Sequence, residues 1–180
     1  MYFTDGPLRV LEREMRQIPG FQSSDLNGPE DYDFMLAEML SGLHNPRFSK
    51  RAWGAYRIAF SGRVFPNSGH RIRFEQQLSP NGMHAPRALA VLYLITADEE
   101  LWEKISHDVY GVSVSFHGSF PCGSSAGILY RAAKELNAGA LPEKLAGSLP
   151  TRIDNHSLAL ILTAFLIRQH GYALLHIDRR

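Results

Sequence analysis

One stretch of the sequence decides the fold: LALILTAFLI, residues 158–167, in which Thr163 is the single polar residue. This length is about half of the roughly 20 residues needed to span a bilayer, so we expect a buried helix here. A helix that is apolar on every side lies in the middle of a bundle. The sequence therefore predicts a helical core in which Leu160, Leu162 and Phe165 are nearly inaccessible to solvent.

Helical patterns also occur over most of the remaining chain. Apolar residues at helical spacing, bounded by Pro, Gly or acidic residues, predict helices over residues 8–18, 29–43, 47–61, 86–95, 98–109 and 125–136. Alternating patterns predict short strands over 71–78, 112–116 and 172–177. The expected fold class is mainly α: a compact single-domain helical bundle of about seven helices with one or two short edge strands.

The chain is expected to form a single helical domain over residues 1–180, in which two short segments echo one another in sequence, as a repeat would. Tyr56-Arg57-Ile58-Ala59 is similar to Tyr130-Arg131-Ala132-Ala133, and each is followed by a loop with Gly or Pro and then an apolar helix. A tandem duplication would explain the echo, with halves at about 29–96 and 97–171. Chance similarity between two amphipathic helices would also explain it.

Composition points to a globular cytoplasmic protein. Hydrophobic residues make up 44% of the 180 residues and charged residues 21%, which is typical of folded domains. The single cysteine, Cys122, excludes an intrachain disulfide and a cysteine zinc cage, and it suits a reducing compartment. The first residues show no basic leader followed by an apolar run, so we expect neither a signal peptide nor a membrane partner.

The net charge of +1 hides an uneven distribution. No acidic residue lies between Glu38 and Glu75, whereas the rest of the chain holds all 18 acidic residues. The cations of that window are Arg47, Lys50, Arg51, Arg57, Arg63, Arg71 and Arg73. On a helix over 47–61, the first four would share one face, opposite the apolar face.

These seven residues are the candidate binding site. A run of cations, most of them arginine, suits the phosphate backbone of a nucleic acid or an acidic protein surface. The alternative is a solvated helix face that is neutralised by the acidic parts of the fold. Arg57 is also a candidate for a structural role, since Arg131 shares its Tyr-Arg-x-Ala context.

A second constellation has the residue order of a metal-dependent phosphohydrolase. His84, the pair His107-Asp108 and Asp154 follow one another as the ligands of the helical HD superfamily do. Imidazoles and carboxylates of this kind hold metal ions that activate water. With eight histidines in the chain, such an order also arises by chance, and His107 at a helix end suits a dipole contact. We expect no metal, no cofactor and no catalytic residue.

The segment from Phe120 to Gly127 resembles a nucleophile or phosphate loop before a helix. A helix N-terminus attracts anions and lowers the pKa of a cysteine. The segment lacks the lysine of a Walker loop and the spacing of a hydrolase elbow, however. Helix capping by Ser124 or Ser125 is the expected role.

Three segments resemble short accessory proteins of bacterial phages and conjugative mobile elements. They are Pro86–Ile95 with Glu99–Trp102, Ser124–Ala133 and the helix Ile161–Gly171, so that the resemblance covers residues 84–171. The opening Tyr2–Leu8 is similar to the start of other small proteins from such elements. The resemblance supplies no catalytic residue. It implies a genomic setting in which small proteins bind and disable host defences, including CRISPR nucleases.

The leading hypothesis is therefore a non-enzymatic binding protein that inhibits a host defence nuclease, as an anti-CRISPR does. A nucleic-acid-binding regulator that uses the basic helix is the second hypothesis, and an HD-type phosphohydrolase is the third. In the first two, the partner is a host protein such as a defence nuclease, or a nucleic acid, bound through the basic 47–73 region.

Overall fold

The computed structural model describes residues 29–42, 45–59, 63–79, 84–121, 123–139 and 153–175, and these residues are mainly helical. The elements are α2 (Pro29–Ser41), α3 (Pro46–Ala59), α4 (Ser68–Gln76), α5 (Pro86–Ala97), α6 (Glu99–Ile105), the 3-10 helix η1 (Ser106–Asp108), β1 (Val109–Tyr110), β2 (Ser113–Val114), α7 (Ser125–Asn137), α9 (Asn155–His170) and α10 (Tyr172–Leu175). The predicted fold class is confirmed. The helix predicted over 8–18 lies outside the described residues.

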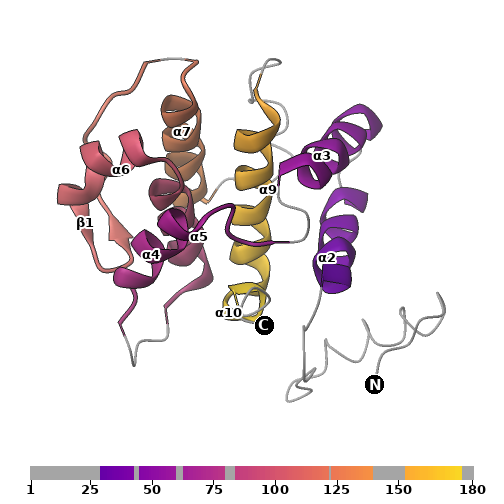
Figure 1. Cartoon of the computed structure of the whole chain (residues 1–180), viewed down its shortest axis with the longest axis horizontal. Coiled ribbons are helices and arrows are strands. Elements are labelled where there is room, and N and C mark those ends of the chain that lie inside the picture. Colours follow the sequence, from indigo (N-terminus) through magenta and orange to yellow (C-terminus); the bar gives the residue numbers. More distant parts are fainter. Residues whose placement is uncertain are drawn as a thin grey trace.

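Helices α5 and α9 lie side by side at the centre of the molecule (Figure 1). Every residue from 89 to 97 in α5 and from 157 to 167 in α9 is buried. Leu160, Leu162 and Phe165 are 1%, 4% and 5% exposed, as the apolar stretch predicted. Within the described residues, no helix combines the length and apolar character that crossing a membrane requires.

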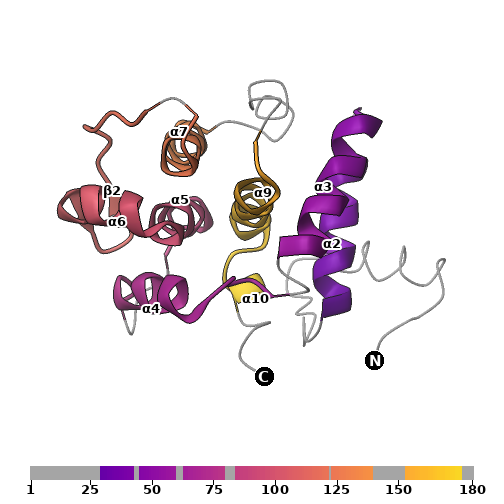
Figure 2. The ribbon, with the colours of Figure 1, turned by 45° about the horizontal axis from the view of Figure 1, so that its top comes forward.

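The other helices flank this pair on both sides (Figure 2). Helix α7 packs against α5, and α4 and α6 also contact α5. Helices α2 and α3 pack against α9 on the opposite side. The basic sequence window is thereby divided, because α3 belongs to the α9 side and α4 to the α5 side.

Short polar side chains fix the starts of five described helices. Asn45, Asn67, Asp98, Ser124 and Asp154 each accept a hydrogen bond from the backbone N–H three residues later, at 2.8–3.1 Å. Such a cap satisfies one of the four N–H groups that the first turn leaves without an intrahelical partner. The role that the sequence assigned to Ser124 or Ser125 is carried out by Ser124.

The strand predicted over 71–78 is wrong, because this segment lies largely within helix α4. Ile72 and Phe74 alternate with polar residues as in a half-buried strand, but Ile72 is 54% exposed. The buried residues are His70 and Phe74, four positions apart on one helical face. The Asn67 cap and this helical spacing determine the structure of the segment.

The strand predicted over 172–177 is also wrong where it is described, since residues 172–175 form α10. Gly171, at a φ of +60°, ends α9 and donates its backbone N–H to the Ile167 carbonyl oxygen. Leu174 and Leu175 are both buried, whereas neighbouring residues of a strand point to opposite faces. The strand predicted over 112–116 is present but shorter: Ser113 and Val114 pair antiparallel with β1.

The echoed segments occupy related places in the packing. Helix α3, which carries Tyr56, packs against α9, and α7, which carries Tyr130, packs against α5. Each of these helices thus contacts the apolar helix of the opposite proposed half. The duplication of 29–96 and 97–171 stays a prediction, but the two segments share one core.

Candidate functional site

The seven predicted binding residues do not form one patch. Figures 1 and 2 place α3 and α4 on different sides of the α5–α9 pair. Arg47, Lys50 and Arg51 lie on α3, Arg71 and Arg73 lie on α4, and Arg63 lies between these helices in the chain. Arg57 lies on α3 too, but its side chain is outside the described part.

The two cations of α4 are engaged within the fold. Arg73 donates from Nε to the carbonyl oxygen of Thr96 at 2.8 Å. Arg71 pairs with Glu75 at 3.1 Å, and its guanidinium lies 5.9 Å from the centre of the Phe65 ring. These contacts reduce the charge that α4 offers to a ligand.

Arg51 joins two helices. Its Nη2 donates to the carbonyl oxygen of Ile153, the residue before the cap of α9. The guanidinium therefore links α3 to the start of α9, and Arg51 is only partly exposed. Its first role is structural.

Arg47 and Lys50 differ from these residues. Both are exposed, and neither makes a hydrogen bond or ion pair with another described residue. Gly54 is exposed on the same side, since positions 47, 50 and 54 follow helical spacing. We define Arg47, Lys50 and Gly54 as the basic face of α3. The sequence of α3 contains no acidic residue, so no carboxylate of this helix neutralises the face.

The HD-type constellation does not come together. His84 Nε2 accepts from the backbone N–H of Ser79 at 3.2 Å, and Asp154 caps α9. His107 and Asp108 lie in η1, which precedes the hairpin. Among the described residues, no three His, Cys, Asp or Glu side chains are grouped so that they could hold a metal ion.

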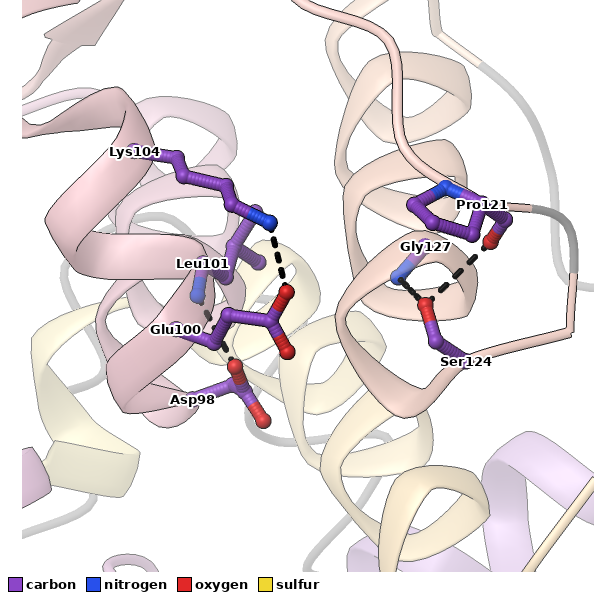
Figure 3. A network of polar contacts seen from close by, with 7 residues as sticks. All are labelled: Asp98, Glu100, Leu101, Lys104, Pro121, Ser124 and Gly127. Atoms are coloured by element: carbon purple, nitrogen blue, oxygen red, sulfur yellow. Dashed lines mark hydrogen bonds and ion pairs between the residues drawn. The ribbon is translucent and has the colours of Figure 1, made fainter.

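Hydrogen bonds within the chain hold the loop before α7 against the first turn of that helix (Figure 3). Ser124 Oγ accepts from the Gly127 N–H at 3.0 Å and donates to the Pro121 carbonyl at 3.2 Å. A Cβ on Gly127 would overlap this carbonyl oxygen, so the close approach requires glycine. Cys122 lies outside the described residues.

Figure 3 also shows the start of α6 beside this loop. Asp98 accepts from the Leu101 N–H at 2.9 Å, and Lys104 pairs with Glu100 one turn along the helix. The Lys104 ammonium lies 5.4 Å from the centre of the Phe120 ring. These contacts hold α6 and the loop in place.

A polar cluster that the sequence did not predict joins the starts of α7 and α9. Asp154 accepts from the Ser157 hydroxyl at 2.6 Å and from Ser125 at 3.3 Å. Burial acts against the charged carboxylate, but these hydrogen bonds outweigh it and hold the pKa of Asp154 below its ordinary value. An Asp-x-x-Ser spacing before an apolar helix is the signal that predicts such a cap.

His70 is the second site that sequence analysis missed. It is fully buried, and its ring lies 4.5 Å from Tyr93 and 5.0 Å from Phe65. Nε2 lies 2.9 Å from the Tyr93 carbonyl oxygen and therefore carries the proton. Nδ1 has no hydrogen-bond partner in the described part of the chain. Burial lowers the pKa of His70 to about 3, so the ring is neutral.

No family model matches the chain, and neither a curated protein nor a solved structure matches it significantly.

Proposed function

We propose that this chain is a binding protein without catalytic activity, and that the basic face of α3 contacts an anionic macromolecule. The observation that carries the proposal is the exposure of Arg47 and Lys50 on a helix that has no acidic residue. Exposed cations gain binding energy from phosphate because they release condensed counterions. Neither cation takes part in a described contact that holds the fold together.

The side chains with the chemistry of a nucleophile, a general acid or a general base have structural roles here, which supports a non-enzymatic function. Ser124 and Asp154 act as helix caps, and His84 accepts from a backbone N–H. His70 has no charged partner at hydrogen-bonding distance in the described structure and is shielded from solvent. A general acid or base instead needs access to a substrate proton.

Nucleic acid is the partner class that the surface of α3 favours. Protein interfaces are centred on aromatic or aliphatic anchors, with the charges at the rim. The exposed large hydrophobic residues in the described structure are Ile72 and Tyr110, which lie on α4 and β1. The basic face of α3 thus presents two cations next to a glycine, as suits a phosphate backbone.

Inhibition of a host defence nuclease is the second candidate function. It is supported by the resemblance of residues 84–171 to accessory proteins of mobile elements and by one exposed side chain. Tyr110 is 75% exposed in the hairpin, and tyrosine is a frequent anchor of protein interfaces. As an inhibitor, the chain would contact the nuclease through the β1–β2 hairpin rather than through the basic face of α3.

Nucleic-acid binding through the basic face of α3 is tested by the salt dependence of binding to a labelled DNA duplex, measured by fluorescence anisotropy. Arg47→Glu and Lys50→Glu should each weaken binding by roughly tenfold or more and reduce the salt slope by about 1. Arg87→Glu, an exposed cation on α5, is the matched control and should retain more affinity. Binding that does not vary with salt, or an equal loss in all three variants, would refute the nucleic-acid form.

Inhibition of a host defence nuclease is tested with a purified CRISPR nuclease in a DNA-cleavage assay. Inhibition that Tyr110→Ala abolishes, and that Arg47→Glu leaves intact, supports docking through the hairpin. The opposite pattern, or no inhibition by the unaltered chain, argues against it.

A further inference from the structure

Gly54 occupies a position where the fold gives no reason for glycine. It lies in the interior of α3 and is exposed. A Cβ added there would meet no atom within 4 Å. Its φ is not in the positive range that requires glycine elsewhere in the chain, for example at Gly171.

Glycine nevertheless weakens a helix at such a position. It loses more backbone freedom on folding than any other residue and ranks just above proline as a helix former. Gly127 illustrates the contrasting case, because there the Pro121 carbonyl fills the space of a side chain. At Gly54, the space that a side chain would fill is open and faces outward on the side of the helix that carries the two cations.

We infer that the phosphate backbone of a nucleic acid lies directly on α3 at Gly54, with Arg47 and Lys50 contacting it along the N-terminal part of the same helix face. The inference rests on the proposed function and specifies its contact geometry. Lys50 lies four residues before Gly54 and Arg47 seven, so all three share one helical face. Without a Cβ, phosphate oxygens approach the helix backbone closer by roughly the length of one carbon–carbon bond.

This close approach has two physical consequences. The side chains of Arg47 and Lys50 reach phosphates further along the helix, because at about 1.5 Å per residue Lys50 lies roughly 6 Å and Arg47 roughly 10 Å from Gly54 along the axis. The Cα–H groups of Gly54 are also weak donors to phosphate oxygen. A methyl group at position 54 would hold the phosphate backbone of the nucleic acid away from the helix and lengthen its contacts with the basic face of α3.

The experiment compares Gly54→Ala and Gly54→Leu with the unaltered chain. Anisotropy is measured with fluorescein-labelled DNA and RNA duplexes of about two helical turns. We expect Gly54→Ala to raise Tm by about 2–4 °C, since alanine is the better helix former. Binding should nevertheless weaken, by roughly tenfold for alanine and further for leucine, with no change in the salt slope.

Asn137→Ala, at the exposed end of α7, is the control for a change in helix propensity away from α3. It should bind as the unaltered chain does. If Arg47→Glu weakens duplex binding while both Gly54 variants bind normally, the close approach is refuted and the proposed function stands. If the unaltered chain binds neither duplex in a salt-dependent way, the proposed function fails, and this inference fails with it.

Discussion

The guanidinium of Arg73 donates to the carbonyl oxygen of Thr96, 23 residues further along the chain, at 2.8 Å. Thr96 is the second-last residue of α5, where carbonyl groups have no intrahelical partner. A cation there also interacts favourably with the helix dipole. One member of the basic sequence window therefore acts as a side-chain cap for the central helix.

Replacement of Arg73 by alanine should destabilise the fold. Loss of a charged hydrogen bond to the end of α5 should lower the free energy of unfolding by about 1.5 kcal/mol. Urea unfolding measures this change. Arg47→Ala, on an exposed side chain with no described partner, is the control and should change stability by less than about 0.5 kcal/mol. Equal effects of the two substitutions would contradict the division of the basic window into structural and exposed residues.

The sequence predicted the central helices because their patterns are nearly independent of context. Residues 158–167 are apolar on all sides, and no surface position in a bundle suits such a helix. Residues 71–78 were assigned wrongly because Ile72 and Phe74 alternate with polar residues. The Asn67 cap, together with tertiary packing that buries Phe74 and leaves Ile72 exposed, resolves that ambiguity.

The sequence predicted which cations are candidates for the site, but not which of them are engaged within the fold and which are exposed. Charge counting identified Arg51 and Arg73 together with Arg47 and Lys50, because all are cations in an acid-free window. Which cations meet a backbone carbonyl depends on where Ile153 and Thr96 lie in three dimensions. That information is absent from local sequence spacing.

A matched pair of glycine substitutions should change stability in opposite directions. Gly127→Ala places a Cβ against the Pro121 carbonyl and should lower the free energy of unfolding by about 1–3 kcal/mol. Gly54→Ala meets open space and should raise it by about 0.5–1 kcal/mol. Thermal or urea unfolding of both variants distinguishes these effects. A stabilising Gly127→Ala would show that the loop before α7 adapts to the added methyl group.

The buried contact between Tyr32 and Thr163 should show energetic coupling. The Tyr32 hydroxyl and Thr163 Oγ1 are hydrogen-bonded across α2 and α9, and both side chains are fully buried. Thr163→Val should lower the free energy of unfolding by about 1–3 kcal/mol, because it removes a buried partner of the tyrosine hydroxyl. The measurement is a double-mutant cycle with Tyr32→Phe, which keeps the ring stacked on Tyr56 at 4.7 Å. Additive effects of the two substitutions would contradict the coupling.

Burial of His70 should make the stability of the fold depend on pH. The pKa of His70 falls from 6.5 to about 3 on folding, chiefly because burial disfavours the charged ring. The unfolded chain therefore binds a proton that the folded chain does not, at every pH between these values. The contribution of His70 to stability is complete above pH 6.5 and is lost as the pH falls toward about 3. Below pH 6.5, the free energy of unfolding should fall by about 1.4 kcal/mol per pH unit.

Urea unfolding between pH 4 and about pH 7 isolates this effect from that of Asp154. The pKa of Asp154 is held below its ordinary value of 3.8, so its stabilising contribution is lost mainly below about pH 4. His70→Gln keeps a side-chain donor for the Tyr93 carbonyl but has no group that titrates in this range. The variant should be less stable than the unaltered chain at pH 7, and its stability should vary less with pH between 4 and 6.5. An unchanged pH dependence would mean that His70 is not the group responsible, and that its ring gains a proton in the folded chain without loss of packing.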